Sequence, residues 1–180
     1  FQTDVVYQVL KRDGVCYSKE EYVRKKYKES AKVFINAYGW FVKEAQHIVP
    51  KPEGAEYPYW AFTDLYNVDQ TGDGHVLTLD VPIGEAILFD MFDWTKIMQM
   101  HYIGENESEE ATFSEELKNM GMNEFQIMTS NFYPEQKARI QESWKRLFGH
   151  QQAIEAGDNS GVHSVQAGLW CIKDEWIVKE

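Results

Sequence analysis

Two aspartates in the segment FDMFDW, Asp90 and Asp93, are the carboxylates whose placement is most suggestive of chemistry. They follow an apolar run expected to be a strand, and they precede a segment expected to be a helix. A carboxylate in this position can accept the free backbone N–H groups at the start of the helix, and aspartate is a preferred residue for this role. Loops at strand ends also commonly carry binding groups, so the alternative is that one of these aspartates holds a hydroxyl or an amide of a ligand.

A second set of oxygen atoms lies in DQTGDGHVLTLD, residues 69–80. An EF-hand loop has oxygen ligands at positions 1, 3, 5 and 12 and a glycine at position 6. These positions are occupied by Asp69, Thr71, Asp73, Asp80 and Gly74. The motif also requires a helix on each side, whereas the segment after this loop alternates like a strand and stops at Pro82. The sequence therefore predicts a glycine-permitted turn that leads into a strand, without a metal site.

The sequence carries no strong catalytic signature, and neither a metal nor a cofactor is predicted. The patterns GxSxG, GxxxxGK[ST], HExxH and a strand-linked GxGxxG are all missing from it. The histidines lack the spacing of zinc ligands; they are His47, His75, His101, His150 and His163. Cys16 and Cys171 form neither a CxxC pair nor a dense framework. Two reduced thiols in a cytosolic protein are therefore expected, with a disulfide between them as the alternative.

Capping residues and apolar periodicity predict the helices that would position these groups. The predicted helices span residues 4–13, 19–47 with a break near Ser30, a segment containing 94–98, 113–120 and 134–148. The residues that mark their starts are Thr3, the capping-box pair Ser18 and Glu21, the pair Thr112 and Glu115, and Pro134. The glycines expected to end helices are Gly14, Gly121 and Gly149.

Extended segments and loops complete the expected fold. Extended segments are predicted at residues 15–17, 59–66, 76–81, 86–90 and 122–128, and as two short strands in 165–180 around a turn at Lys173 and Asp174. The acidic stretch GENESEE and the stretch EAGDNSG are expected to be exposed loops. Since no linker or repeat interrupts the chain, residues 1–180 should form a single compact α+β domain. We expect small, mostly antiparallel sheets with helices packed around them.

The composition is that of an acidic folded domain. The chain has 180 residues, 43% of them hydrophobic, and a formal net charge of −11. Such a surface repels phosphate backbones and anionic lipid, so direct nucleic-acid binding is not expected. No apolar run approaches the roughly 20 residues that a membrane helix needs. The first residues also lack the basic start and apolar core of a signal peptide, so the expected location is cytoplasmic.

Six aromatic-rich segments follow one another in an order that spans nearly the full chain. They are FQT at 1–3, FINAYGW at 34–40, YPYWAF at 57–62, VPIGEAILFDMFDW at 81–94, SWKRLF at 143–148 and VQAGLWCIKDEWIV at 165–178. Together they resemble bacterial domain-of-unknown-function family 3841. Phe89 stands where relatives tend to carry a serine. The resemblance implies a shared fold and an uncharacterised bacterial or phage-borne protein, and it implies no established activity.

The order of the expected elements is also similar, more distantly, to the layout of ADP-ribosyltransferase-type folds. In those enzymes a residue on the first strand and a glutamate on a late strand flank the nicotinamide ribose of NAD. Gln2 or Thr3 and Gln166 stand at the matching places, although the amide of Gln166 cannot stabilise a cationic sugar as a carboxylate does. This similarity implies, as an alternative function, an NAD- or nucleotide-using transferase with an atypical site.

The leading functional hypothesis is a non-catalytic binding or regulatory module. An aromatic-lined cleft would hold a small molecule or a protein partner, as ligand sites commonly do. The transferase is the enzymatic alternative, and a defence- or phage-related inhibitor that acts as an acidic decoy is a third hypothesis. The tentative ligand-binding residues are Gln2, Thr3, Trp60, Asp90, Asp93, Trp94 and Gln166.

Overall fold

The computed structural model describes residues 1–28 and 31–179, which form the predicted α+β fold. The helices are α1 (Asp4–Asp13), α2 (Glu20–Tyr27), α3 (Ala31–Ala45), α4 (Met91–Met98), α5 (Glu107–Asn119), α6 (Glu124–Thr129), α7 (Pro134–Ser143) and α8 (Gln151–Glu155). The strands are β1 (Val15–Tyr17), β2 (Tyr59–Phe62), β3 (Thr78–Leu79), β4 (Ala86–Asp90), β5 (Val165–Leu169), β6 (Cys171–Lys173) and β7 (Ile177–Lys179). The predicted helix break near Ser30 lies outside the described residues.

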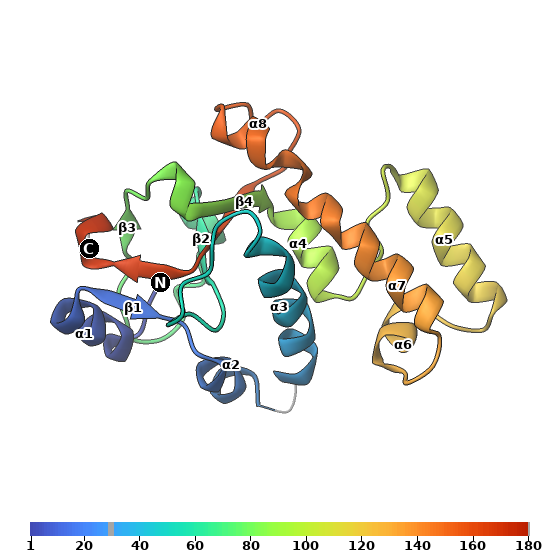
Figure 1. The fold of residues 1–180 in the computed structure, drawn as a ribbon, viewed down its shortest axis with the longest axis horizontal. Coiled ribbons are helices and arrows are strands. Elements are labelled where there is room, and N and C mark those ends of the chain that lie inside the picture. Colours follow the sequence, from blue (N-terminus) through green and yellow to red (C-terminus); the bar gives the residue numbers. More distant parts are fainter. Residues whose placement is uncertain (29–30, 180) are drawn as a thin grey trace.

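The strands form three small antiparallel sheets. β5 lies at the centre of a three-stranded sheet with β2 and β4 at its edges, while β1 pairs with β6 and β3 pairs with β7. Figure 1 shows the strands and α1 toward one end of the molecule and α5, α6 and α7 at the other, with α3 and α4 between them. The two-stranded pairs therefore extend the strand-rich end, and the three-stranded sheet meets the helices.

The three-stranded sheet has a hydrophobic cluster on each face. Successive residues of a strand point to opposite faces, so Trp60, Gly168 and Ile87 share one face because they are aligned in register. On this side an aromatic cluster joins the sheet to α3 and α4. Gly168 permits the close approach of α3, since a Cβ at this position would lie 2.9 Å from Cζ of Phe41. The opposite face packs against a smaller cluster that includes Leu10 of α1.

Several predicted elements are confirmed. α1 covers the predicted residues and is followed by Gly14 with φ of 74°, the left-handed conformation that glycine adopts at low cost. Thr3 occupies the N-cap position, but its side chain makes no capping bond, and its carbonyl accepts the Tyr7 N–H instead. Strand β4 matches the predicted residues 86–90. The two cysteines are free thiols, as predicted, and both are buried.

The strand predicted for residues 122–128 is wrong, because most of this segment forms helix α6. The Asn123 side chain accepts the Gln126 backbone N–H at 2.9 Å, and the Gln126 side chain accepts the Asn123 N–H at 3.0 Å. This reciprocal pairing is a capping box. It satisfies two N–H groups that a helix start leaves free, and it therefore favours a helix over the predicted strand.

Two predicted capping boxes are also corrected. α5 begins within the supposed loop GENESEE, where the Asn106 side chain accepts the Glu109 N–H at 3.0 Å. Thr112 therefore lies inside this helix, and its hydroxyl donates to the Ser108 carbonyl. At α2, the carboxylate of Glu56 accepts the N–H of Glu20, so the helix start is capped by a distant residue instead of by Ser18.

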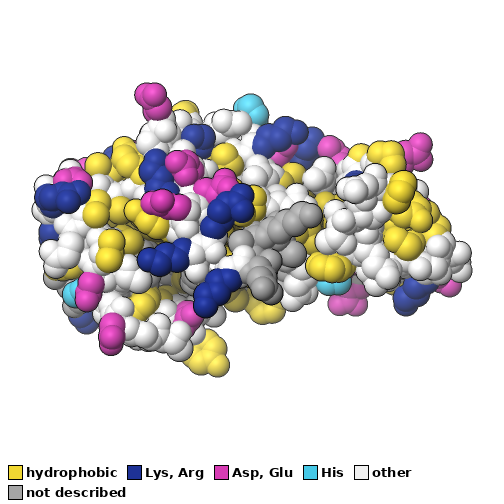
Figure 2. Space-filling view, turned by 90° about the horizontal axis from the view of Figure 1, so that it is seen from below, with side chains coloured by type: hydrophobic (Ala, Val, Ile, Leu, Met, Phe, Trp, Pro, Cys, Tyr) yellow, Lys and Arg dark blue, Asp and Glu magenta, His cyan; other side chains and the backbone are white. Residues whose placement is uncertain are grey.

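Three boundaries differ from those expected. Only Thr78–Leu79 of the predicted strand 76–81 is paired in β3. Gly149 does not end the helical region, which continues through a 3-10 segment at Trp144–His150 into α8. Residues 165–179 form three strands instead of two, because a break at Trp170 separates β5 from β6. The 3-10 turn at Asp174–Trp176, which separates β6 from β7, lies close to the predicted turn at Lys173 and Asp174. Charged side chains of both signs are interspersed on the face seen in Figure 2, and hydrophobic side chains gather at the end that carries α5 to α7.

Candidate functional site

Asp90 is a buried carboxylate at the point where β4 passes into α4. The residue is 3% exposed and is the N-cap of the helix, where its Oδ1 accepts the Phe92 N–H at 3.0 Å. Its Oδ2 accepts the backbone N–H of His163 at 3.0 Å and lies 2.8 Å from Nδ1 of the same residue. Asp90 therefore caps α4, as predicted, and also ties the helix start to the segment that enters β5.

The carboxylate of Asp90 fixes the orientation of the His163 imidazole. Burial alone would raise the pKa of Asp90, but hydrogen bonds from the backbone and ring of His163 and from the Phe92 N–H outweigh it and hold the pKa below its ordinary value. An ionised carboxylate can only accept, so Nδ1 of His163 carries the proton and donates it. The imidazole edge with Nε2 belongs to a side chain that is 74% exposed.

An exposed aromatic ring accompanies this imidazole. Phe92 is 52% exposed, and its ring centroid lies 4.9 Å from that of His163 with an interplanar angle of 37°. A large aromatic ring is usually more stable when it is buried than when it is exposed to water. The pair therefore presents a flat apolar surface beside a hydrogen-bonding nitrogen.

Asp93 occupies the first turn of α4, three residues after Asp90. Its side chain is 19% exposed and lies 3.9 Å from the Lys96 ammonium. Burial raises the pKa of Asp93; the Lys96 charge opposes the increase, and the negative charge of Asp90 adds to it. The two predicted carboxylates thus have pKa values shifted in opposite directions, which is typical of groups in different environments near one site.

The remaining predicted residues lie at the aromatic cluster between the central sheet and α4. Trp60 is half-buried and donates from Nε1 to the Tyr38 hydroxyl at 3.0 Å, while Trp94 is 5% exposed. Their ring centroids lie 4.7 Å apart. Gln166 is 3% exposed, and its Oε1 has no hydrogen-bond partner. Buried polar atoms are nearly always paired, so this oxygen is an unusual feature of the cluster.

Gln2 and Thr3 lie with a different part of the fold. Gln2 exchanges two backbone hydrogen bonds of 2.8 Å with His75, in the segment before β3, and Thr3 occupies the N-cap position of α1 without a side-chain capping bond. β3 pairs with β7 and not with the three-stranded sheet. The structure therefore brings Asp90 and Asp93 together near the end of β4 and places Gln2 and Thr3 elsewhere.

The EF-hand-like segment is a turn, as predicted. A short 3-10 helix at Leu65–Asn67 precedes it and β3 follows it. This segment therefore does not lie between the two helices that flank a calcium loop. Oδ1 of Asp69 accepts the N–H and the hydroxyl of Thr71 at 3.0 and 2.7 Å, and Gly72 has φ of 99°. Across residues 1–28 and 31–179, no three or more histidine, cysteine or acidic side chains are grouped to hold a metal ion.

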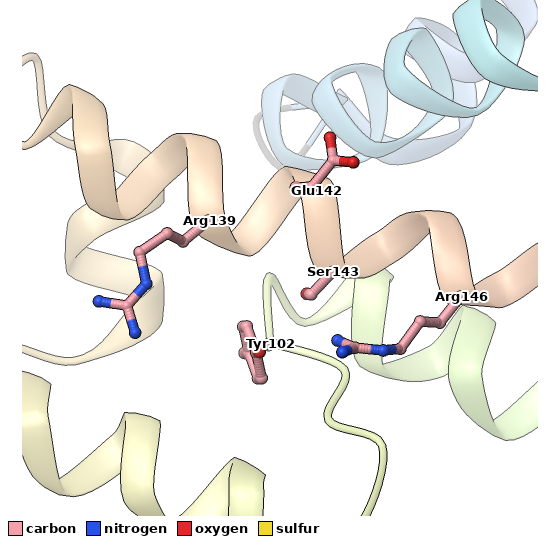
Figure 3. Close-up of a pocket in the computed structure, with 5 residues that line it drawn as sticks. All are labelled: Tyr102, Arg139, Glu142, Ser143 and Arg146. Carbon is pink, nitrogen blue, oxygen red and sulfur yellow. The ribbon is translucent and has the colours of Figure 1, made fainter.

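An open groove of about 410 Å³ lies between α7 and the segment that leads into α5 (Figure 3). Its lining residues are Tyr102, Arg139, Glu142, Ser143 and Arg146. Figure 3 shows the two arginines on either side of Tyr102, with Ser143 above the tyrosine and to its right. The Ser143 hydroxyl accepts the Ile103 N–H and donates to the Ile140 carbonyl, so it joins the two walls of the groove.

Both arginines of the groove are held against aromatic rings. The Arg139 guanidinium lies 4.7 Å from the Phe113 ring and makes two bonds with Glu116, of 2.5 and 3.0 Å. The Arg146 guanidinium lies 5.9 Å from the Tyr102 ring and donates to the Ile103 carbonyl at 2.7 Å. Such contacts fix the planes of the guanidinium groups and keep them at the groove.

Sequence reasoning missed His163 and the two arginines. His163 was one of several scattered histidines, and only the pairing of β4 with β5 brings it to Asp90. Arg139 and Arg146 are seven residues apart, close to two helical turns, which is a local signal that they share one side. Nothing in the sequence places Tyr102 between them.

The fold is thus an acidic α+β domain with a carboxylate–histidine pair at a strand end. A family model described as "Domain of unknown function (DUF3841)" matches residues 1–178, and the chain belongs to this family, as its aromatic segments indicated. No curated protein and no solved structure matches the chain. The ADP-ribosyltransferase layout and the NAD- or nucleotide-using alternative receive no support from these comparisons. None of the helices within the described residues has the length and apolar character needed to cross a bilayer.

Proposed function

We propose that this chain is a non-catalytic binding or regulatory module that recognises a small molecule or a protein partner at the end of β4. The observation that carries the proposal is the fixed orientation of His163 by the buried carboxylate of Asp90. Orienting an exposed side chain in this way reduces the entropy lost when a ligand binds to it.

The chemistry of the pair defines the group it would recognise. In the neutral form of the imidazole with Nδ1 donating to Asp90, Nε2 is a hydrogen-bond acceptor, and the matching group is then an N–H or O–H donor. The exposed Phe92 ring beside it favours a planar or apolar body attached to that donor. Asp93, in the first turn of the same helix, adds a carboxyl group to the rim.

The other predicted residues of this region belong to the packing between α4 and the sheet, next to the site. Trp60 and Trp94 pack against each other and hold α4 on the sheet, and Gln166 lies on the same face. Gln2 and Thr3 have no part in the proposal. The net charge of −11 argues against nucleic acid as the partner. Two free thiols fit a reducing compartment such as the cytoplasm.

Benzamide and phenol are suitable probes, because each combines a ring with a hydrogen-bond donor. NMR spectra of the protein labelled at histidine and phenylalanine side chains would be followed during titration with each probe. We expect saturable shifts at the His163 and Phe92 rings. His163→Phe should abolish the shift at Phe92, which remains as the reporter, since the substitution keeps the ring contact and removes Nε2. His47→Phe, a change at an exposed histidine in another part of the chain, is the matched control.

The comparison of the two variants distinguishes specific binding at His163 from other causes of a shift. Saturable shifts that disappear in His163→Phe and persist in His47→Phe support the binding site. Shifts that are absent, or equal in both variants, contradict it. Toluene, which has a similar ring and no donor, should produce at most weak shifts if the donor recognises Nε2.

A further inference from the structure

The end of the three-stranded sheet at which β4 ends and β5 begins carries exposed rings in an acidic part of the chain. We infer that it binds an arginine side chain within a segment of a partner protein. This inference rests on the function proposed above for Asp90, His163 and Phe92, and it names the chemical class of their ligand.

Three segments of the chain meet at Ser164, next to His163. The Ser164 carbonyl accepts the Met91 N–H at 2.9 Å, and its hydroxyl accepts the Asn67 side-chain amide, also at 2.9 Å. Asn67 ends the 3-10 helix Leu65–Asn67, whose first two side chains are 58% and 93% exposed. This end of the sheet therefore exposes Leu65 and Tyr66 in addition to Phe92 and His163.

The net charge of the chain resides in the segments that build this sheet. Residues 52–95 contain nine acidic residues and residues 147–172 contain two, and neither segment contains a lysine or an arginine. The remainder of the chain has equal numbers of acidic and basic residues, so the whole net charge of −11 belongs to these two segments. They include β2, β4 and β5 and the start of α4. A cationic partner is therefore attracted to this part of the fold.

The carboxylates near the exposed rings outnumber the ammonium groups that pair with them. Asp64 is exposed, and its Oδ1 accepts the Tyr66 N–H at 2.8 Å, which places one carboxylate at the start of the 3-10 helix. Asp90 and Asp93 lie at the start of α4. The Lys96 ammonium lies 3.9 Å from Asp93 but only 2.7 Å from Glu110, so it is shared between two carboxylates. A further cation is needed to balance these charges.

Arginine combines the chemical properties that this surface recognises. Its guanidinium is a planar cation with five N–H donors, and it stacks on aromatic faces. One N–H can donate to Nε2 of neutral His163 while the plane lies on an exposed ring. A lysine ammonium carries the same charge but has no plane to stack.

The exposure of the side chains favours a protein segment over a small molecule. Sites for small molecules usually bury most of the ligand, whereas Tyr66, Phe92 and His163 are each more than half exposed. Residues on either side of the arginine can contact Leu65 and Tyr66. The partner is therefore a segment in which apolar residues flank an arginine.

The test uses an acetylated and amidated peptide, Gly-Leu-Arg-Leu-Gly, and the same peptide with lysine or citrulline in place of arginine. Citrulline keeps the planar shape and N–H donors but has no charge. NMR spectra of the full chain labelled at histidine, phenylalanine and tyrosine are recorded at pH 8, which favours neutral imidazole rings. We expect saturable shifts at Tyr66, Phe92 and His163. The citrulline peptide should bind about two- to fivefold more weakly, the range that a single exposed ion pair supports, and the lysine peptide should also bind more weakly.

A matched pair of variants separates a specific site from general attraction to an acidic chain. Asp64→Asn retains an oxygen that can accept the Tyr66 N–H and removes one charge. It should weaken binding of the arginine peptide by about two- to fivefold and leave the citrulline peptide unaffected. Glu115→Gln removes an exposed charge on α5, at the helical end of the molecule (Figure 1), and should change neither affinity.

Several results would overturn the inference. Equal affinities for the arginine and citrulline peptides would remove the role of charge, and equal losses in Asp64→Asn and Glu115→Gln would show general attraction. Acetylarginine amide binding as tightly as the peptide would assign the surface to small guanidinium compounds. Benzamide shifts at Phe92 without a preference for the arginine peptide would contradict this inference alone. The absence of saturable shifts with every probe would contradict the proposed function as well.

Discussion

The side chain of Gln151 pairs with the backbone of Leu88 in the way that a neighbouring strand would. Its Oε1 accepts the Leu88 N–H at 2.5 Å, and its Nε2 donates to the Ala86 carbonyl at 3.2 Å. β4 lies at the edge of its sheet, where unpaired backbone groups would otherwise invite another strand. One buried amide at the start of α8 therefore closes this edge.

Gln151→Leu should destabilise the fold by about 2 kcal/mol, because it leaves buried backbone groups of β4 without partners. The measurement is the free energy of unfolding from urea denaturation. Gln152→Leu, at the exposed next position of the same helix, should change it little. Equal effects of the two substitutions would show that the Gln151 amide does not stabilise the edge.

Asp90→Asn should destabilise the protein by about 2 kcal/mol at pH 7, since charge-assisted hydrogen bonds from His163 and Phe92 are weakened. The folded-state pKa of Asp90 lies below its ordinary value. Its stabilisation is therefore present above the ordinary pKa of about 3.9 and is lost as the pH falls through the folded-state pKa. The difference in unfolding free energy between wild type and variant should shrink between pH 7 and pH 3, and a constant difference would contradict this.

Asp93→Asn should show the opposite pH dependence. Because burial raises the folded-state pKa of Asp93, the contribution of this group is most favourable below the ordinary pKa of about 3.9 and is lost as the pH rises through the raised pKa. The variant avoids burying a charge, so its stability relative to wild type should increase from pH 3 to pH 7. Urea unfolding at several pH values measures this, with exposed Asp73→Asn as the control. A relative loss of stability as the pH rises would refute the prediction.

Gln166→Leu should stabilise the fold by about 1 kcal/mol, because it removes a buried oxygen that has no partner and retains a side chain of similar size. Thermal and urea unfolding both report the change. The matched variant Gln46→Leu, at an exposed position, should have little effect. Destabilisation by Gln166→Leu would mean that a bound water or ligand satisfies this oxygen in solution.

Local signals were sufficient for part of the fold and of the site. Gly14 ends α1, and Asp90 caps α4, because each effect depends on residues only a few positions away. The apolar run 86–90 is a strand buried along its whole length, as its composition indicated. The two carboxylates of the candidate site could therefore be predicted as neighbours of the β4–α4 junction.

The missed features depend on residues that are distant in sequence. The start of α2 is fixed by Glu56, which lies 36 residues after Glu20. His163 reaches Asp90 only because β4 and β5 pair in antiparallel register. The groove requires α7 to pack beside the segment that contains Tyr102. α6 is different, since its capping box is formed by Asn123 and Gln126, only three positions apart, and is therefore a local signal.

The placement of β5, β6 and β7 has a consequence for synthesis of the protein. Residues 165–179 supply a strand to each of the three sheets formed within the described parts of the chain. No sheet can be completed until this stretch has left the ribosome, when β5 must enter between β2 and β4. Strand pairs between residues that are distant in sequence form slowly. Until β5, β6 and β7 have paired, the other strands expose their edges and apolar faces. The nascent chain therefore keeps these edges and faces exposed until residues 165–179 have been made.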